Sequence, residues 1–292
     1  MAKPGASRLT PYLFIGPFLL PFAVFSLWPL LDNLWLSFMD YFLAERATLW
    51  NGFANYVLLT EADWSLQVLK NTLLFLLTVP CMQMVALALA LLVQQPLRGM
   101  GFFRTLYYLP VVIAISIAGV TWRYVFHYDG VLNGLLSLLW PGVQIDWLGD
   151  RHVALYATML FSLWKNAGYY MVLYLAGLQS VPRALLDAAQ MDGAGCWQRL
   201  RHVTLPALRP IILLSTLLST IGALKAFQEI LVLTGGASDT LTLLMLVYGA
   251  AFHWQSFGLA AAVAVLMMLL CFTIAAVQFQ LFGPRGVWGR DI

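Results

Sequence analysis

Polar side chains that could bind a solute recur at helical spacing inside a long apolar stretch near the middle of the chain. Positions i, i+3, i+4 and i+7 of this stretch are Ser162, Lys165, Asn166 and Tyr169. This spacing places them on one face of a helix. Hydroxyl, amide and ammonium groups beside an aromatic ring could bind the hydroxyls and the apolar face of a sugar, so the face is predicted to line a substrate cavity. The alternative is structural, with Lys165 paired to a carboxylate of another subunit or to Glu229.

A second polar group, Lys225, Gln228 and Glu229, lies near the end of another apolar stretch. Lys225 and Glu229 are four residues apart, which places them on one face of a continuous helix. A charged side chain inside a bilayer costs about 2.5–3.5 kcal/mol on insertion scales, and it usually pairs or lines a cavity. Two interpretations remain open. The two charges neutralise each other near the outer interface, or the group lines the substrate path.

The other reactive residues form no pattern typical of a metal or catalytic site. The four histidines fall at span ends or in loops, and the three cysteines fit no metal-ligand spacing. The sequence has no GxxxxGK[ST] phosphate-binding loop, so it is not predicted to bind ATP by that route. We therefore predict no metal, no cofactor and no enzymatic activity in this chain.

The elements that position these residues follow from the composition. Of the 292 residues, 61% are hydrophobic and 10% are charged, against roughly 25% charged in soluble domains. So few charges cannot cover a soluble protein of this size, which excludes a soluble enzyme, a disordered chain and a nucleic-acid-binding protein. Because lipid offers the backbone no hydrogen-bond partners, the apolar stretches must be helices. The predicted fold class is an all-α integral membrane protein.

Six apolar stretches are long enough to cross a bilayer, which takes about 20 residues of helix. They lie in one membrane domain over residues 12–283, flanked by termini over 1–11 and 284–292. A further apolar run over 241–252 is too short and predicts an interfacial or re-entrant helix, with a seventh span as the alternative. The six predicted spans are 12–31, 72–93, 105–122, 152–180, 207–234 and 257–282.

The basic residues predict the orientation of these spans. Lys and Arg are enriched in cytoplasmic loops of membrane proteins. If the N-terminus is cytoplasmic, ten of the 16 basic residues fall on the cytoplasmic side, and the opposite loops are acidic. Both termini are therefore predicted to be cytoplasmic in a multi-pass protein. Four of these basic residues lie in one cytoplasmic loop or just after it: Arg183, Arg199, Arg201 and Arg209.

The same cytoplasmic loop, residues 181–206, has the pattern of two short helices joined by a tight turn. Residues 183–191 favour helix, and Gly193 can supply the positive φ that a turn needs. A second short helix is predicted over 197–202, ending at Leu205-Pro206. Loops between packed helices usually have about 2–8 residues. The length and pattern therefore indicate a docking element rather than a simple connection.

The loop resembles the coupling motif of permeases from binding-protein-dependent ABC importers. Asp187-Ala188-Ala189 stands where the family has Glu-Ala-Ala, and Asp192-Gly193-Ala194 matches its Asp-Gly-Ala. Leu200 and Val203 stand for a Phe and an Ile, and Leu205-Pro206 matches the Leu-Pro that closes the motif. Asp187 is one methylene shorter than the family's Glu, which bears on the salt bridge that this Glu makes to the ATPase.

Shorter matches extend the resemblance over nearly the whole chain. Three further parts of the chain are similar to stretches of sugar permeases: Phe103-Arg104-Thr105 with Leu109-Pro110, Trp147 to Asp150, and Leu233 to Gly236 with Thr240-Leu241-Thr242. Together they resemble the first subunit of maltose-type and glycerol-phosphate-type importers. The resemblance implies the type I importer permease fold, with six transmembrane helices and a cytoplasmic coupling loop.

The resemblance also implies the function and the partners. The chain would import a carbohydrate or polyol across a bacterial or archaeal inner or plasma membrane by alternating access. Its partners would be a second, different permease, two copies of a cytoplasmic ATPase that bind ATP and Mg²⁺, an extracytoplasmic solute-binding protein and membrane lipid. Monosaccharides, oligosaccharides, polyols and glycerol phosphate all fit as substrates. The alternatives are an ion-coupled secondary transporter that uses Glu229 and a membrane enzyme, for which the sequence lacks a catalytic constellation.

Overall fold

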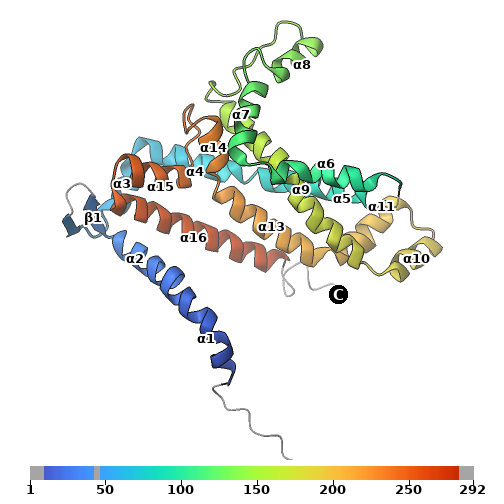
Figure 1. The fold of residues 1–292 in the computed structure, drawn as a ribbon, viewed down its shortest axis with the longest axis horizontal. Helices are drawn as coiled ribbons and strands as arrows, with labels where there is room; N and C mark the ends of the chain where they lie inside the picture. The colour runs from blue at the N-terminus through green and yellow to red at the C-terminus, as the bar shows by residue number, and fades with distance from the viewer. Residues whose placement is uncertain (1–9, 43–46, 96, 283–292) are drawn as a thin grey trace, which may run out of the picture. The chain divides into compact units, whose positions relative to one another are not determined.

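The computed structural model describes residues 10–42, 47–95 and 97–282 (Figure 1). Residues 1–9 and 284–292 of the predicted cytoplasmic termini lie outside this range. Backbone contacts divide the chain into two compact units, Met1–Ala62 with Val247–Leu266, and Asp63–Leu246 with Met267–Ile292. The candidate site residues all belong to the second unit.

The first unit begins with a helical run that covers the predicted span 12–31 and continues to Leu36. Pro17 and Pro21 lie inside its first helix, and a π-helical turn follows them. A short antiparallel hairpin comes next, with Met39 opposite Trp50. The elements are α1 Thr10–Phe22, η1 Ala23–Leu27, α2 Trp28–Leu36, β1 Met39–Phe42, β2 Ala47–Trp50 and α3 Ala54–Glu61.

The second unit is helical over most of its described length. The last three elements of the chain are divided between the two units, at Leu246 and Leu266: α15 Leu243–Tyr248, η3 Gly249–His253 and α16 Phe257–Phe282. The elements of the unit itself are α4 Asp63–Phe75, α5 Thr78–Val93, α6 Met100–Val112, α7 Ile115–Val125, α8 Val131–Leu139, α9 Ala154–Ser180, α10 Arg183–Met191, α11 Cys196–Arg199, η2 Leu200–Thr204, α12 Leu205–Ala207, α13 Arg209–Leu224 and α14 Gln228–Leu233.

Three helical segments in the described residues are long and apolar enough to cross a membrane: Phe14–Leu36, Asp63–Val93 and Phe257–Leu281. Two bent helix pairs, α6 with α7 and Cys196–Ala207 with α13, raise this to five if each pair is one span. Helix α9 is not among them, but its 27 residues are about 40 Å long at the usual rise, enough to cross. The apolar run at 241–252 forms a short helix, Leu243–His253.

Helix α9 is the central helix of the second unit and packs along α5 (Figure 1). Ala86 and Ala90 of α5 are fully buried, and they face a cluster that includes Met171 and Tyr174 of α9. Small residues let two helix backbones approach closely. Gly168 of α9 likewise allows a close approach to α6, because an added Cβ there would overlap the backbone of Tyr107.

The predicted span over 105–122 is not one continuous helix. Helices α6 and α7 meet at an angle of 99°, and Ile113 and Ala114 between them are extended. Pro110 lacks the N–H that would bond to the preceding turn. The β-branched residues Val111 to Ile113 then follow, and such residues are weak helix formers. The carbonyls of Pro110 and Val111 are bonded elsewhere, to Lys165.

The predicted span over 207–234 is not one continuous helix either. The chain bends by 72° at Leu208, and α13 then ends at Leu224, three residues before α14. Lys225 caps α13, so Lys225 and Glu229 do not share a helix face as predicted. Gly222 weakens the last turn of α13. The Ala226 carbonyl accepts a hydrogen bond from Thr242 Oγ1 at 2.7 Å, so a tertiary contact replaces the helical one.

Candidate functional site

The loop over 181–206 forms the predicted pair of helices around a left-handed glycine. Helix α10 has the predicted bounds, Arg183–Met191. Gly193 follows with φ +79°. The Gly193 N–H bonds to the Gln190 carbonyl at 3.1 Å, and the Ala194 N–H bonds to the Ala189 carbonyl at 2.9 Å. These two bonds make a Schellman cap. An added Cβ on Gly193 would meet nothing within 4 Å, so the glycine is required for its backbone conformation.

The second helix of the loop is longer than predicted. It runs over Cys196–Ala207, with a π-helical turn at Leu200–Thr204. Gln198 Oε1 accepts the Gly195 N–H at 2.8 Å and caps its start. The predicted end at Leu205-Pro206 is wrong by one residue, because the helix continues through Pro206 to Ala207.

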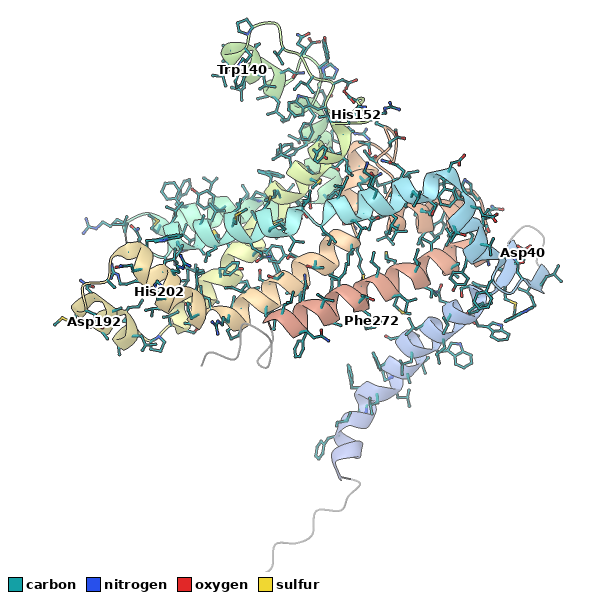
Figure 2. All side chains as sticks on the ribbon, turned by 180° about the vertical axis from the view of Figure 1, so that it is seen from behind. Asp40, Trp140, His152, Asp192, His202 and Phe272 are labelled. Carbon is teal, nitrogen blue, oxygen red and sulfur yellow. The ribbon has the colours of Figure 1, made fainter. Side chains whose placement is uncertain are left out.

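The residues predicted to couple to an ATPase gather on the surface of this helix pair. A hollow of about 390 Å³ is lined by Ala189, Asp192, Gly193 and Ala194, together with His202 and others from the second helix. Figure 2 shows Asp192 and His202 on this segment. Asp187 and Ala188 are exposed beside the hollow, and Leu205 and Pro206 are half-buried at the far end of the pair.

A second group of predicted residues meets in a polar recess between α5, α9, α13 and α14. The recess has a volume of about 120 Å³. Ser162, Asn166 and Glu229 line it, so three of the seven residues predicted for the substrate path come together here. Ser162 Oγ donates to Glu229 Oε1 at 3.5 Å, and Asn166 Nδ2 donates to the Ser162 carbonyl at 2.9 Å. Tyr170 and Ser219 complete much of the polar lining.

The other four residues predicted for the path lie outside the recess. Lys165 is buried, 8% exposed, and its Nζ donates to the carbonyls of Pro110 at 2.7 Å and Val111 at 3.0 Å. Tyr169 is 45% exposed and packs edge-on against Tyr170. Lys225 and Gln228 are exposed at the ends of α13 and α14. The face of α9 that enters the recess is therefore 162–166–170, one position away from the predicted face at 165 and 169.

A buried polar network beneath the recess was missed by the sequence analysis. Tyr174 OH and Ser215 Oγ each donate to Gln83 Oε1 at 2.6 Å, and Gln83 Nε2 donates to Ser219 Oγ at 2.8 Å. These bonds join α9 and α13 to α5. A signal existed, because Ser215 and Ser219 are four residues apart inside an apolar helix and Gln83 lies in an otherwise apolar span.

The recess is suited to hydrogen bonding a polar solute. It presents hydroxyl, amide and carboxyl groups beside the Tyr170 ring. No cluster of three His, Cys, Asp or Glu that could hold a metal occurs within the described residues. Its volume is below the roughly 300–1,000 Å³ typical of small-molecule sites. The recess is therefore too small to be a complete small-molecule site within the described residues of this chain.

Comparisons with known proteins agree with this geometry. Residues 6–286 match the family described as the inner membrane component of binding-protein-dependent transport systems. The chain is 36% identical over 293 residues to the lactose transport system permease protein LacF of Rhizobium radiobacter, covering 96% of this chain and 98% of that protein. It is 30% identical to the sn-glycerol-3-phosphate transport system permease protein UgpA of Agrobacterium fabrum, covering 97% and 98%.

A solved structure gives the same fold. The chain matches a bacterial alginate ABC transporter in complex with an alginate pentasaccharide-bound periplasmic protein. The TM-score is 0.78 at 22% sequence identity, over 94% of this chain and 93% of that chain. The predicted fold class, an all-α membrane protein with the ABC importer permease fold, is confirmed.

These matches also decide between the alternatives for the activity. They give no support to an ion-coupled transporter. The chain is a transport component of an ABC importer and not an enzyme, and partner subunits hydrolyse the ATP. It belongs to the family of inner membrane components of binding-protein-dependent transport systems.

Proposed function

We propose that this permease imports a carbohydrate or polyol that an extracytoplasmic solute-binding protein delivers. The names of its relatives support this class, since they include a lactose and an sn-glycerol-3-phosphate permease. The recess supports it independently, because hydroxyl, amide and carboxyl groups beside a tyrosine ring match the hydroxyls and apolar face of a sugar.

The substrate path uses the recess as its wall in this subunit. Ser162, Asn166 and Glu229 form hydrogen bonds with the solute. Tyr169, Lys225 and Gln228 are exposed outside the recess, and they contact the solute on a surface that a second, different permease subunit covers. Lys165 supports the path indirectly, because its Nζ holds the carbonyls at the end of α6.

The observation that carries the coupling function is the Schellman-capped helix pair over 181–206. Its exposed motif, including Asp187 and Gly193, docks on one of two cytoplasmic ATPase subunits. The capped turn makes the pair stiff, so closure of the ATPase dimer moves the membrane helices as nearly rigid bodies. ATP and Mg²⁺ bind to the ATPase subunits and not to this chain.

The orientation follows from the charge pattern. Four basic residues lie in or beside the coupling segment, residues 181–206: Arg183, Arg199, Arg201 and Arg209. Basic residues near the ends of membrane spans stay on the cytoplasmic side. Both termini are then cytoplasmic, in the inner or plasma membrane of a bacterium or archaeon.

The test is transport in proteoliposomes that contain the complete importer and its binding protein. Uptake should require ATP inside the vesicle and should stop with vanadate. Uptake driven by an ion gradient without ATP would overturn the proposal. The substrate class is tested by which sugars or polyols raise the melting temperature of the cognate binding protein. A response to amino acids alone would exclude a carbohydrate.

A further inference from the structure

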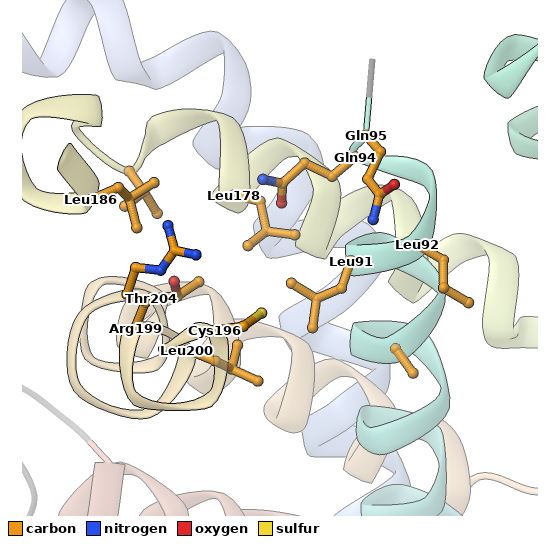
Figure 3. A pocket seen from close by; sticks show the side chains of 12 residues that line it. Leu91, Leu92, Gln94, Gln95, Leu178, Leu186, Cys196, Arg199, Leu200 and Thr204 are labelled. Atoms are coloured by element: carbon orange, nitrogen blue, oxygen red, sulfur yellow. The ribbon is translucent and has the colours of Figure 1, made fainter. Parts of the chain in front are cut away.

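A cavity of about 500 Å³ lies beside the coupling segment, between the last turns of α5 and α9 and the helices α10 and α11 (Figure 3). Its walls are mostly apolar and include Leu91, Leu92, Leu178, Leu186 and Leu200. The cavity is separate from the recess and from the hollow that carries the coupling motif, apart from Arg199, which borders both the cavity and the hollow. Its volume is within the range of small-molecule sites.

The polar groups of this cavity favour an anion. Arg199 is a lining residue, and Figure 3 shows its guanidinium among the leucines. Its Nη1 donates to Gln190 Oε1 at 3.3 Å, but its buried Nε has no acceptor among the described residues. The amides of Gln94 and Gln95 also line the cavity. None of the described lining residues carries a carboxylate.

A second positive charge lies at the same end of α5. Arg104 Nε and Nη2 donate to the Val93 carbonyl at 3.1 and 2.8 Å, which caps the last turn of that helix. The combination of cationic and amide groups with leucine walls is amphipathic. A soluble phosphate would leave the leucine walls without a partner, whereas a lipid would occupy both parts.

We propose that this cavity binds an anionic phospholipid of the cytoplasmic leaflet. Its phosphate pairs with Arg199 and the neighbouring amides, and an acyl chain lies along the leucines. Basic pockets at the cytoplasmic ends of membrane helices bind such headgroups. The bound lipid fills the space between the coupling helices and the ends of α5 and α9, so it braces the coupling segment against the membrane helices. The inference rests on the proposed function in one respect, namely that these ends of α5 and α9 face the cytoplasm.

The first test is native mass spectrometry of the complete importer, released from nanodiscs of phosphatidylcholine mixed with phosphatidylglycerol. The wild-type complex should retain phosphatidylglycerol. Arg199→Gln should lower that retention by about fivefold, as expected for one basic contact, and Arg199→Lys should keep most of it. Arg201→Gln is the matched control, because Arg201 is exposed on the same helix and does not line the cavity. Equal retention in the two Gln variants would overturn the proposal.

The second test uses Cys196, which lines the cavity and is exposed. In a Cys81→Ser, Cys271→Ser background, a maleimide should modify Cys196 quickly in phosphatidylcholine nanodiscs. Phosphatidylglycerol should slow the reaction, and Arg199→Gln should abolish the slowing. The same slowing by inorganic phosphate would show a soluble-anion site instead. If the bound ATPase already protects Cys196 from the maleimide in phosphatidylcholine nanodiscs, a polypeptide fills the cavity. Either outcome overturns the lipid assignment.

The two tests separate this inference from the proposed function. Both are run on the assembled complex, whose ATP hydrolysis is measured in parallel. A complex that hydrolyses ATP and transports but shows no lipid selectivity overturns the lipid site alone. A complex that retains phosphatidylglycerol through Arg199 but neither hydrolyses ATP nor transports overturns the proposed function alone.

Discussion

The coupling segment and the polar recess are assembled in different ways. The coupling segment is built within about 25 consecutive residues, and hydrogen bonds between residues three to five apart close its turn. The recess takes its lining from α5, α9, α13 and α14, so Thr78 and Glu229 meet across much of the chain. The first surface is exposed, whereas the second lies inside the helix bundle.

This difference shows what each region needs in order to function. The coupling segment depends on local backbone geometry, above all the left-handed Gly193, and can be altered without disturbing the bundle. The recess depends on the close helix packing at Gly168 and on the hydrogen bonds of Lys165, so changes to these supporting residues affect stability and transport together. Variants of the two regions should therefore separate by abundance as well as by uptake.

The largest expected effect on the protein itself comes from Gly168→Ala in α9. The added Cβ would overlap the Tyr107 backbone, and such overpacking costs about 1–3 kcal/mol. We expect lower membrane abundance and a lower melting temperature. Gly134→Ala in α8 is the control, because an added Cβ there meets nothing within 4 Å. Equal melting temperatures for the two variants would show that α6 and α9 are not closely packed.

Lys165→Met should also destabilise the protein, by about 1–3 kcal/mol, because two partly buried carbonyls lose their donor. Thermal unfolding in detergent measures the loss. The matched control is Lys225→Met, at an exposed position, which should change stability by less than about 0.5 kcal/mol. The opposite ranking would mean that Lys165 does not hold the bend between α6 and α7.

Asn166→Ala should weaken uptake while leaving abundance near normal. Loss of one hydrogen bond to the solute, about 0.5–1.5 kcal/mol, corresponds to roughly a two- to tenfold rise in KM. Tyr169→Ala should weaken uptake by less, because its ring lies outside the recess. Thr273→Ala serves as the control, since this exposed hydroxyl bonds only to its own helix at Leu269. An unchanged KM for Asn166→Ala would remove the recess from the path.

The smallest effect is expected from Asp187→Asn in the coupling segment. An exposed ion pair contributes about 0–1 kcal/mol, so ATPase binding should weaken by up to about fivefold, and the difference should shrink at high salt. Asp187→Glu restores the residue typical of the family and should bind at least as tightly as wild type. Salt titration of ATPase binding measures both variants. A loss that does not depend on salt would exclude an ion pair.

The sequence predicts the local structure of residues 181–206 well because its signals are local. The bounds of α10 and the turn at Gly193 follow from helix propensity and glycine conformation. The error at Leu205-Pro206 arises because the helix, after a π-helical turn at Leu200–Thr204, continues through the proline to Ala207. The exposed motif also carries the family resemblance, which the comparisons confirm.

The recess is less predictable because long-range contacts decide it. Helical spacing selects Ser162 and Asn166, which line the recess, but it places Lys165 on the same face. Lys165 instead donates to the carbonyls of Pro110 and Val111 in α6. The pairing of Lys225 with Glu229 assumes a continuous helix, and a hydrogen bond from Thr242 stabilises the break instead. Gln83 shows no function in isolation, and its role appears only with Tyr174 and Ser215 beside it.

The most direct test of the central claim is the coupling of transport to ATP hydrolysis in proteoliposomes that carry Gly193→Val. A β-branched residue is disfavoured in the left-handed region by about 1–2 kcal/mol, so the Schellman cap should fail while the membrane helices still insert. Gly195→Ala is the control, because Gly195 has an ordinary φ of −66°. We predict that Gly193→Val inserts normally but loses ATP-driven uptake, whereas Gly195→Ala transports like wild type. Normal uptake by Gly193→Val would contradict the assignment of residues 181–206 as the coupling element.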